Sequence, residues 1–102
     1  VSIVEHHANI VPWLILKEDY GINVEFIGVT ENFALDYNDF RDKLTNKVKI
    51  VALTHVSNTI GQIFDISNVA SLLSVRYGKD KPILIIDGSQ SIPHFSVNVQ
   101  TL

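Results

Sequence analysis

The sequence contains no cysteine, which excludes disulfides, thiolate metal ligands and a nucleophilic cysteine within its 102 residues. It also contains no methionine, not even at position 1. The chain opens on an apolar stretch and closes without a charged tail. We therefore expect both ends to be truncated, and residues 1–102 to form a single partial domain of a longer protein.

Basic residues are few, and they do not form a run. Eight Lys and Arg against eleven Asp and Glu give a formal net charge of -3. This balance argues against nucleic acid and against an anionic membrane surface as partners, because both attract clustered positive charge. No apolar stretch approaches the roughly 20 residues that span a bilayer. The chain is 46% hydrophobic and 19% charged, which is typical of a globular protein.

Short apolar runs alternate with longer helical patterns along the chain. The predicted strands are Val1–Val4, Val24–Val29, Val48–Thr54 and Pro82–Ile86. The predicted helices are Asn9–Tyr20, Tyr37–Leu44 and a segment that runs from Asp65 to Tyr77. The last strand is apolar at every position, which is typical of a strand covered by helices on both faces. This alternation predicts an α/β fold with a mostly parallel sheet flanked by helices.

Local signals mark the ends of the predicted helices. Pro12 lies in a first turn, where its missing N–H costs nothing, and Gly21 and Gly78 follow last turns. Asp36 and Asp65 are predicted N-caps, since their carboxylates can accept from the first free N–H groups. The buried stripe predicted for the third helix is Ile66, Val69, Leu72 and Leu73.

Polar and titratable side chains follow three of the four predicted strands. The three clusters are Glu5, His6 and His7; His55, Ser57 and Asn58; and Asp87, Ser89 and Gln90. Ligands of open α/β sheets bind at the carboxyl ends of parallel strands, so these clusters should meet at one edge. Each cluster also has a structural interpretation, such as a turn at Asp87 and Gly88. Their coincidence at equivalent positions favours a binding site.

The residue types in these clusters suit pyridoxal phosphate (PLP). An aspartate beside the pyridine nitrogen keeps that nitrogen protonated and the ring electron-withdrawing. A histidine ring can stack on the cofactor face, and side-chain amides can donate hydrogen bonds to the phenolic oxygen. Asp87, His6, Asn58 and Gln90 supply this set.

Other chemistries remain open from the residues alone. His6, His7, His55 and His94 could form a zinc site, although they lack a recognisable ligand spacing. Ser89, His55 and Asp87 could form a hydrolase triad, but the Gly-x-Ser-x-Gly elbow lacks its second glycine. No glycine-rich dinucleotide loop and no Walker-type lysine loop is present.

Three motifs resemble those of cysteine desulfurases of the SufS-like group, which are class V aminotransferases of PLP fold type I. They are Glu-His-His-Ala-Asn-Ile-Val-Pro-Trp (5–13), Thr-His-Val-Ser-Asn-Thr-Ile-Gly (54–61) and Asp-Gly-Ser-Gln-Ser (87–91). The resemblance covers essentially the whole chain, in order and with compatible spacing. It implies that the chain is the central portion of the PLP-binding large domain.

The resemblance assigns roles to individual residues. It implies that His6 stacks on the PLP ring and assists proton transfer, with His7 at a second position of less defined role. It implies that Asp87 pairs with the pyridinium nitrogen and that Asn58 and Gln90 donate to the phenolic oxygen. His6 is thus the predicted catalytic residue, the four together are the predicted cofactor-binding residues, and no metal is expected.

The rest of the machinery is expected outside this chain. In the family, a Gly/Thr turn that binds the phosphate precedes the first motif. The lysine that holds PLP covalently follows in a Ser-x-His-Lys segment, and the sulfur-accepting cysteine comes later still. Ser89 stands where many relatives have Ala, and Asn98 where they commonly carry Asp. The stretch Tyr77–Pro82 is slightly longer than in relatives, which indicates a surface insertion.

The implied activity is removal of sulfur from L-cysteine, leaving L-alanine and an enzyme persulfide for iron–sulfur cluster assembly or other sulfur transfer. A sulfur-acceptor protein, a homodimer and a cytoplasmic or organellar location are implied with it. Selenocysteine lyase or another class V aminotransferase is the first alternative, and a non-catalytic PLP-fold binding domain is the second. The isolated chain should expose sheet edges and aggregate readily.

Overall fold

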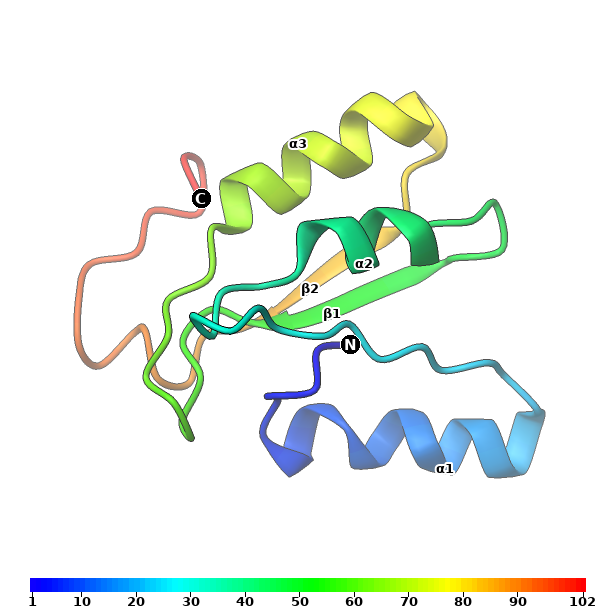
Figure 1. The fold of residues 1–102 in the computed structure, drawn as a ribbon, viewed down its shortest axis with the longest axis horizontal. Helices are drawn as coiled ribbons and strands as arrows, with labels where there is room; N and C mark the ends of the chain where they lie inside the picture. The colour runs from blue at the N-terminus through cyan, green and yellow to red at the C-terminus, as the bar shows by residue number, and fades with distance from the viewer.

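The computed structural model describes the whole chain, Val1–Leu102. Its helices are α1 (Val11–Tyr20), α2 (Tyr37–Lys43) and α3 (Ile66–Tyr77), and its strands are β1 (Ile50–Thr54) and β2 (Ile83–Asp87). Two 3-10 turns, η1 (His7–Asn9) and η2 (Gly78–Asp80), complete the elements. Figure 1 shows α2 and α3 on one side of the strand pair and α1 on the other. This layered arrangement confirms the predicted α/β class.

The two strands pair in parallel, with α3 as the connection between them. Their register runs from Ile50 opposite Ile83 to Thr54 opposite Asp87. Parallel strands need a crossover of this kind, because a tight turn can join only antiparallel neighbours. As a result, both strands end at the same edge of the sheet.

The prediction that Val1–Val4 and Val24–Val29 are strands was wrong. The two segments meet at one isolated parallel bridge, Ser2 opposite Ile27, which two backbone hydrogen bonds to Ile27 support. The first segment then turns into η1, and Val29 bridges instead to Leu35 across a tight turn. The two segments therefore diverge after a single bridge, and no ladder of hydrogen bonds forms between them.

The other predicted boundaries differ from the structure by one to two residues. The third strand begins at Ile50 rather than Val48, and the fourth covers Ile83–Asp87 rather than Pro82–Ile86. Pro82 has no N–H to give to a ladder, so the pairing starts one residue later. The first helix begins at Val11 because the preceding residues form the separate turn η1.

The predicted capping residues of the helices are confirmed. The Asp36 carboxylate accepts from two backbone N–H groups at the start of α2, and Asp65 accepts from Asn68 N–H at the start of α3. Gly21 ends α1 with φ 67°, a left-handed conformation that glycine adopts without steric cost. Gly78 ends α3 with a positive φ of 59°.

The hydrophobic core lies between the strands and the α2–α3 layer. Of the predicted stripe on α3, Ile66, Val69 and Leu73 are buried, and Leu72 is only half-buried. The buried core residues are Ile27, Leu35, Phe40, Leu44, Val51, Leu53, Phe64, Ile66, Val69 and Leu73. Burial of this set is the main source of stability in the fold.

The expectation that helices cover both faces of the last strand was wrong for β2. Leu84 and Ile86 pack against the core, whereas Ile83 and Ile85 are 66% and 38% exposed on the opposite face. Alternate residues of a strand point to opposite faces, so the exposed pair lies on the side of α1. No residue of α1 is buried, and α1 leaves this face of β2 open.

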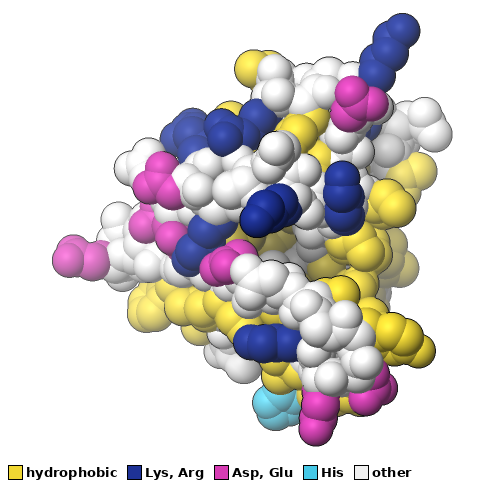
Figure 2. All heavy atoms as spheres, turned by 90° about the vertical axis from the view of Figure 1, so that its right-hand side faces the viewer, with side chains coloured by type: hydrophobic (Ala, Val, Ile, Leu, Met, Phe, Trp, Pro, Cys, Tyr) yellow, Lys and Arg dark blue, Asp and Glu magenta, His cyan; other side chains and the backbone are white.

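Charged side chains of both signs are mixed on the surface. Figure 2 shows Lys and Arg interspersed with Asp and Glu over one face of the molecule. The one ion pair joins Lys43 to Asp39 on α2 at 2.7 Å. Asp39 also accepts from Gly28 N–H at 2.7 Å, which fastens α2 to the segment carrying Ile27. None of the helices is long and apolar enough to cross a membrane.

Two valines on α3 allow a matched test of the core. Val69 is completely buried, and Val75 is 87% exposed on the same helix. We expect Val69→Ala to lower the free energy of unfolding by about 2 kcal/mol, through lost burial and a new cavity. Val75→Ala should change it by less than about 0.5 kcal/mol. Urea unfolding measures both, and equal effects would contradict the placement of α3.

Candidate functional site

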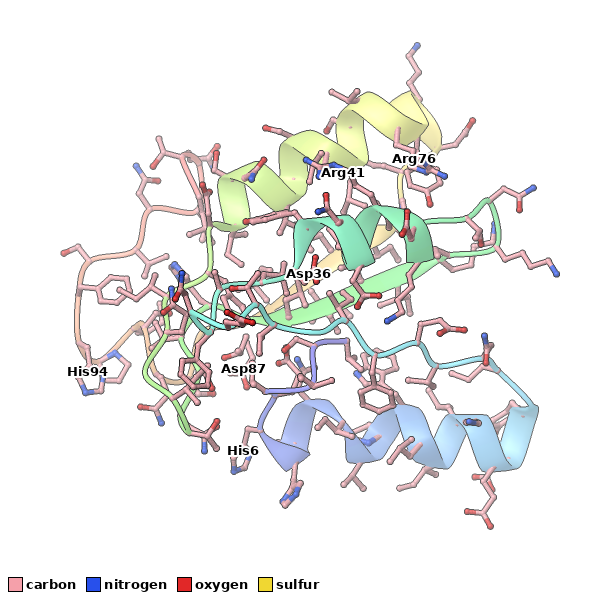
Figure 3. The ribbon with its side chains drawn as sticks, in the orientation of Figure 1. His6, Asp36, Arg41, Arg76, Asp87 and His94 are labelled. Carbon is pink, nitrogen blue, oxygen red and sulfur yellow. The ribbon has the colours of Figure 1, made fainter.

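A pocket of about 270 Å³ lies where β1 and β2 end. Its volume is close to the lower limit of about 300 Å³ for small-molecule sites. The lining residues are His6, Ala8, Thr54, Val56, Asn58, Asp87, Ser89 and Gln90. All four predicted site residues are among them, so each of the three polar clusters contributes to this pocket. The clusters of Asn58 and Asp87 follow β1 and β2, whereas His6 follows an isolated bridge rather than a strand. Figure 3 shows His6 and Asp87 together at this end of the strands.

Asp87 is the last residue of β2, and it lines the pocket. Its Oδ1 accepts a hydrogen bond from the Ser89 backbone N–H at 2.9 Å. Hydrogen bonding by the Ser89 side chain and then by its backbone lowers the pKa of Asp87, and the nearby His6 adds to this effect. Asp87 is therefore an anion at neutral pH, which suits a partner for a protonated ring nitrogen.

His6 reaches the same pocket from the turn that precedes α1. It is the N-cap of η1, and its Nδ1 accepts from the Ala8 backbone N–H at 3.2 Å. Its carbonyl oxygen accepts from the Asn9 N–H at 2.8 Å. The ring itself is exposed, so its orientation depends on the conformation of this turn. His7 does not line the pocket, and its ring centroid lies 6.2 Å from that of His6.

Asn58 and Gln90 contribute the amide groups of the pocket. Neither side chain makes a hydrogen bond within the chain, although the Gln90 carbonyl oxygen contacts His94 Nδ1 at 2.6 Å. Both side-chain amides thus keep their N–H donors free for a ligand.

The loop that carries Asn58 is fastened to the segment that carries His6. The buried Ser57 Oγ donates to the Val4 carbonyl oxygen at 3.1 Å. The Gly61 N–H closes the same loop by donating to the Ser57 carbonyl oxygen. These contacts join two walls of the pocket that are 53 residues apart in the sequence.

Three residues of the pocket, Ala8, Thr54 and Val56, were not predicted. Thr54 and Val56 line it, and Thr54 Oγ1 donates to the Val56 carbonyl oxygen at 2.8 Å. Thr54 was within reach of the strand-end argument, because it is the last residue of its strand. Val56 gave no such signal, since it is an apolar residue between polar neighbours.

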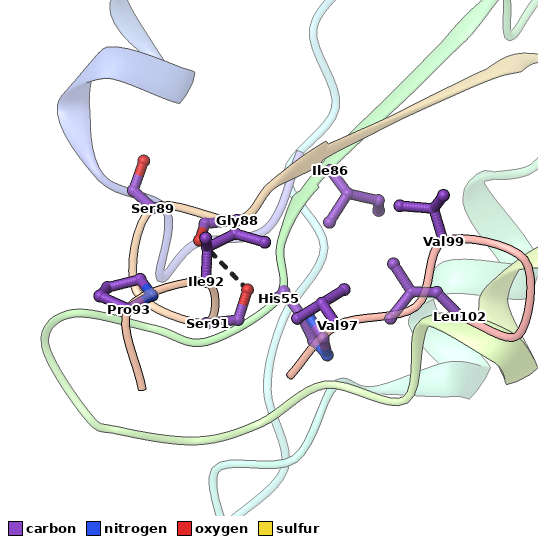
Figure 4. Close-up of a pocket in the computed structure, with 10 residues that line it drawn as sticks. All are labelled: His55, Ile86, Gly88, Ser89, Ser91, Ile92, Pro93, Val97, Val99 and Leu102. Atoms are coloured by element: carbon purple, nitrogen blue, oxygen red, sulfur yellow. Dashed lines mark hydrogen bonds between the residues drawn. The ribbon is translucent and has the colours of Figure 1, made fainter. Parts of the chain in front are cut away.

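His55 does not line this pocket. It is only 6% exposed, its Nδ1 has no hydrogen-bond partner, and its ring meets Phe95 edge-on at 5.5 Å. It lines a second pocket of about 550 Å³, together with residues of the loop after β2 (Figure 4). Apolar side chains of Ile86, Val97 and Leu102 form much of that wall. The polar groups that could orient a ligand converge in the smaller pocket.

The four histidines do not come together. No group of three or more His, Asp, Glu or Cys side chains in Val1–Leu102 is arranged to hold a metal ion. The zinc interpretation therefore gains no support from the geometry. The triad interpretation fails for a related reason, because His55 and Asp87 line different pockets.

Comparison with known proteins shows which family the chain belongs to. The aminotransferase class-V family matches residues 1–102, which is the whole chain. The chain belongs to this family. The predicted resemblance is thereby confirmed at the level of the class V aminotransferases.

The curated relatives have consistent names. The chain is 35% identical to a probable cysteine desulfurase of Xylella fastidiosa, covering 100% of this chain and 24% of that protein. It is 38% identical to probable cysteine desulfurase 1 of Mycobacterium leprae, covering 100% of this chain and 16% of that protein. The chain thus spans about a quarter or less of the length of these relatives.

A solved structure shows the same fold. The cysteine desulfurase CsdA of Escherichia coli superimposes with a TM-score of 0.85 at 28% identity. The match covers 97% of this chain and 24% of that one. The fold prediction is confirmed, since this piece has the same arrangement as part of a cysteine desulfurase.

The donor set of the smaller pocket fits the ring end of PLP. An ionised carboxylate, an imidazole and two free amides match a protonated ring nitrogen, a ring face and a phenolic oxygen. No Lys or Arg lines the pocket, so it offers no charge for a phosphate.

The buried His55 should make stability depend on pH. Burial lowers the pKa of His55 below its ordinary value of about 6.5. As pH falls below this value, the unfolded chain gains a proton that the folded chain excludes, so stability is lost. We expect His55→Phe to reduce the loss of unfolding free energy between pH 7.5 and 5.5, measured by urea unfolding. His7→Phe, at an exposed site, should leave the loss as in the wild type; an undiminished loss in His55→Phe would refute the assignment.

Proposed function

We propose that this chain is the central part of the large domain of a PLP-dependent cysteine desulfurase of the SufS-like group. The enzyme takes sulfur from L-cysteine and leaves L-alanine and an enzyme persulfide. The observation that carries this proposal is the convergence of His6, Asn58, Asp87 and Gln90 on one pocket. The relatives named as cysteine desulfurases support it.

Each of the four residues has a defined task in this proposal. PLP, when bound, supplies an electron-withdrawing ring that stabilises negative charge on the substrate. Asp87 holds the proton on the ring nitrogen, because its own carboxylate stays ionised. His6 covers one face of the ring and assists proton transfer. Asn58 and Gln90 donate hydrogen bonds to the phenolic oxygen.

The whole enzyme needs parts that this chain does not contain. We place the PLP-binding lysine, the phosphate-binding turn and the persulfide cysteine elsewhere in the longer protein. We also propose that it works as a homodimer in the cytoplasm and passes sulfur to an acceptor protein. Iron–sulfur cluster assembly is the proposed destination of that sulfur.

Substitution of Asp87 tests the cofactor assignment in the full-length protein. We expect Asp87→Ala to shift the visible absorption band of bound PLP and to lower turnover about a hundredfold or more, since the ring loses its proton-holding partner. Asp80→Ala is the control, because Asp80 is exposed in η2 and does not line the pocket. An unchanged band and unchanged turnover in Asp87→Ala would show that the pyridinium assignment is wrong.

The substrate is tested by comparing the products that the protein forms from different amino acids. Full-length protein purified with PLP should release equimolar L-alanine from L-cysteine and acquire a persulfide detectable by mass spectrometry. Release of alanine from L-selenocysteine alone would instead make the protein a selenocysteine lyase. Amino transfer to a keto acid would make it an aminotransferase. Failure to hold PLP at all would favour a non-catalytic domain.

A further inference from the structure

A buried carboxylate stands directly beside the predicted stacking histidine. Glu5 is 6% exposed, and no Lys or Arg pairs with it. Its Oε1 accepts from Ser2 Oγ at 2.6 Å, and its Oε2 accepts from Asn9 Nδ2 at 2.8 Å. Ser2 and Asn9 are themselves buried, at 0% and 9% exposed. Both oxygens of this carboxylate are therefore occupied by neutral donors inside the protein.

The two hydrogen bonds of Glu5 reach residues on either side of His6. Ser2 lies four residues before the histidine, at the bridge to Ile27, and Asn9 lies three residues after it. Asn9 in turn donates its backbone N–H to the His6 carbonyl oxygen at 2.8 Å. The Ala8 N–H between them donates to His6 Nδ1 at 3.2 Å. The carboxylate thus closes the turn whose amides orient the imidazole.

The His6 ring has little other support. Its side chain is exposed, and its only hydrogen bond is the one from Ala8. A change in the turn should therefore move the ring, because its other neighbour is the tilted ring of His7, 6.2 Å away between centroids and itself exposed. Burial of a carboxylate also costs free energy, which a closed turn made of neutral side chains would not.

From this geometry we propose that Glu5 is a positioning residue, whose carboxylate fixes the turn 2–9 so that His6 faces the cofactor pocket. This inference rests on the proposed function, because it assigns Glu5 a task toward the ring that His6 covers. Glu5 itself does not line the pocket. Its effect should therefore pass entirely through His6.

The test uses the full-length protein purified with PLP and a cycle of Glu5→Ala, His6→Ala and the double variant. Visible circular dichroism of the bound cofactor reports the asymmetry of its surroundings, including a ring stacked on it. We expect Glu5→Ala to reduce this signal by at least half and kcat by about tenfold, with a smaller change in KM. In the His6→Ala background, Glu5→Ala should change neither quantity further. If the effects of Glu5→Ala and His6→Ala on the cofactor signal and on kcat were fully additive in the double variant, the proposal would be overturned.

Two further variants separate positioning from general stability. Glu5→Gln can keep both hydrogen bonds if the Asn9 amide turns over, so it should stay within twofold of wild type. Glu25→Ala is the matched control, because Glu25 accepts from Asn23 Nδ2 at 2.6 Å in the same way but is exposed and does not line the pocket. A lowered melting temperature in Glu5→Ala with an unchanged cofactor signal would reduce Glu5 to a stabilising residue and refute the inference.

Hydrogen exchange makes the result independent of the cofactor. Glu5→Ala should speed amide exchange at Ala8 and Asn9 relative to wild type, and unchanged exchange would overturn the proposal even in protein without PLP. If Glu5→Ala does not fold, Asn9→Ala removes one of the two hydrogen bonds to the Glu5 carboxylate. This variant must then also reduce the circular dichroism of the cofactor and speed amide exchange at Ala8. Wild-type protein that binds no PLP would count against the proposed function alone.

Discussion

The site depends above all on the parallel pairing of β1 with β2. Because the last pair of that register is Thr54 with Asp87, both strands stop at the same height. The His55 N–H continues the pairing one step further by donating to the Asp87 carbonyl oxygen at 2.9 Å. A slip of the register by one residue would turn Asp87 to the other face of the sheet. The buried face of α3 holds the register, since α3 is the crossover between the strands.

Features set by local chemistry could be predicted from the sequence. Asp36 and Asp65 cap helices because their carboxylates reach backbone groups two or three residues away, and Gly21 ends α1 for a similarly local reason. The strand assignment of Val1–Val4 failed because a strand exists only through a distant partner. A short apolar run does not reveal whether its partner continues alongside it or, as at Val29, turns away.

The candidate site followed from topology rather than from any single residue. The parallel ends of β1 and β2 bring Asn58 and Asp87 together, so their convergence could be predicted from the sequence. His6 reaches the pocket from the turn before α1, where the predicted strand did not form. The burial of individual residues could not be predicted. His55 and Asn58 stand three residues apart in one polar motif, yet His55 is buried and Asn58 is exposed. The hydrogen bonds of Glu5 could not be predicted for a similar reason. Its partners are selected by the irregular turn before α1, which no periodic pattern describes.

The hydrogen bond from Ala8 to His6 also determines what that imidazole can offer. While Nδ1 accepts from the backbone, the neutral ring must carry its hydrogen on Nε2. The outer edge of the ring is then a donor and attracts acceptors such as a carboxylate. To take up a proton at Nδ1, the ring must first release the Ala8 N–H and with it part of the turn. The tautomer of the ring and the conformation of the backbone turn are thus linked at this one residue.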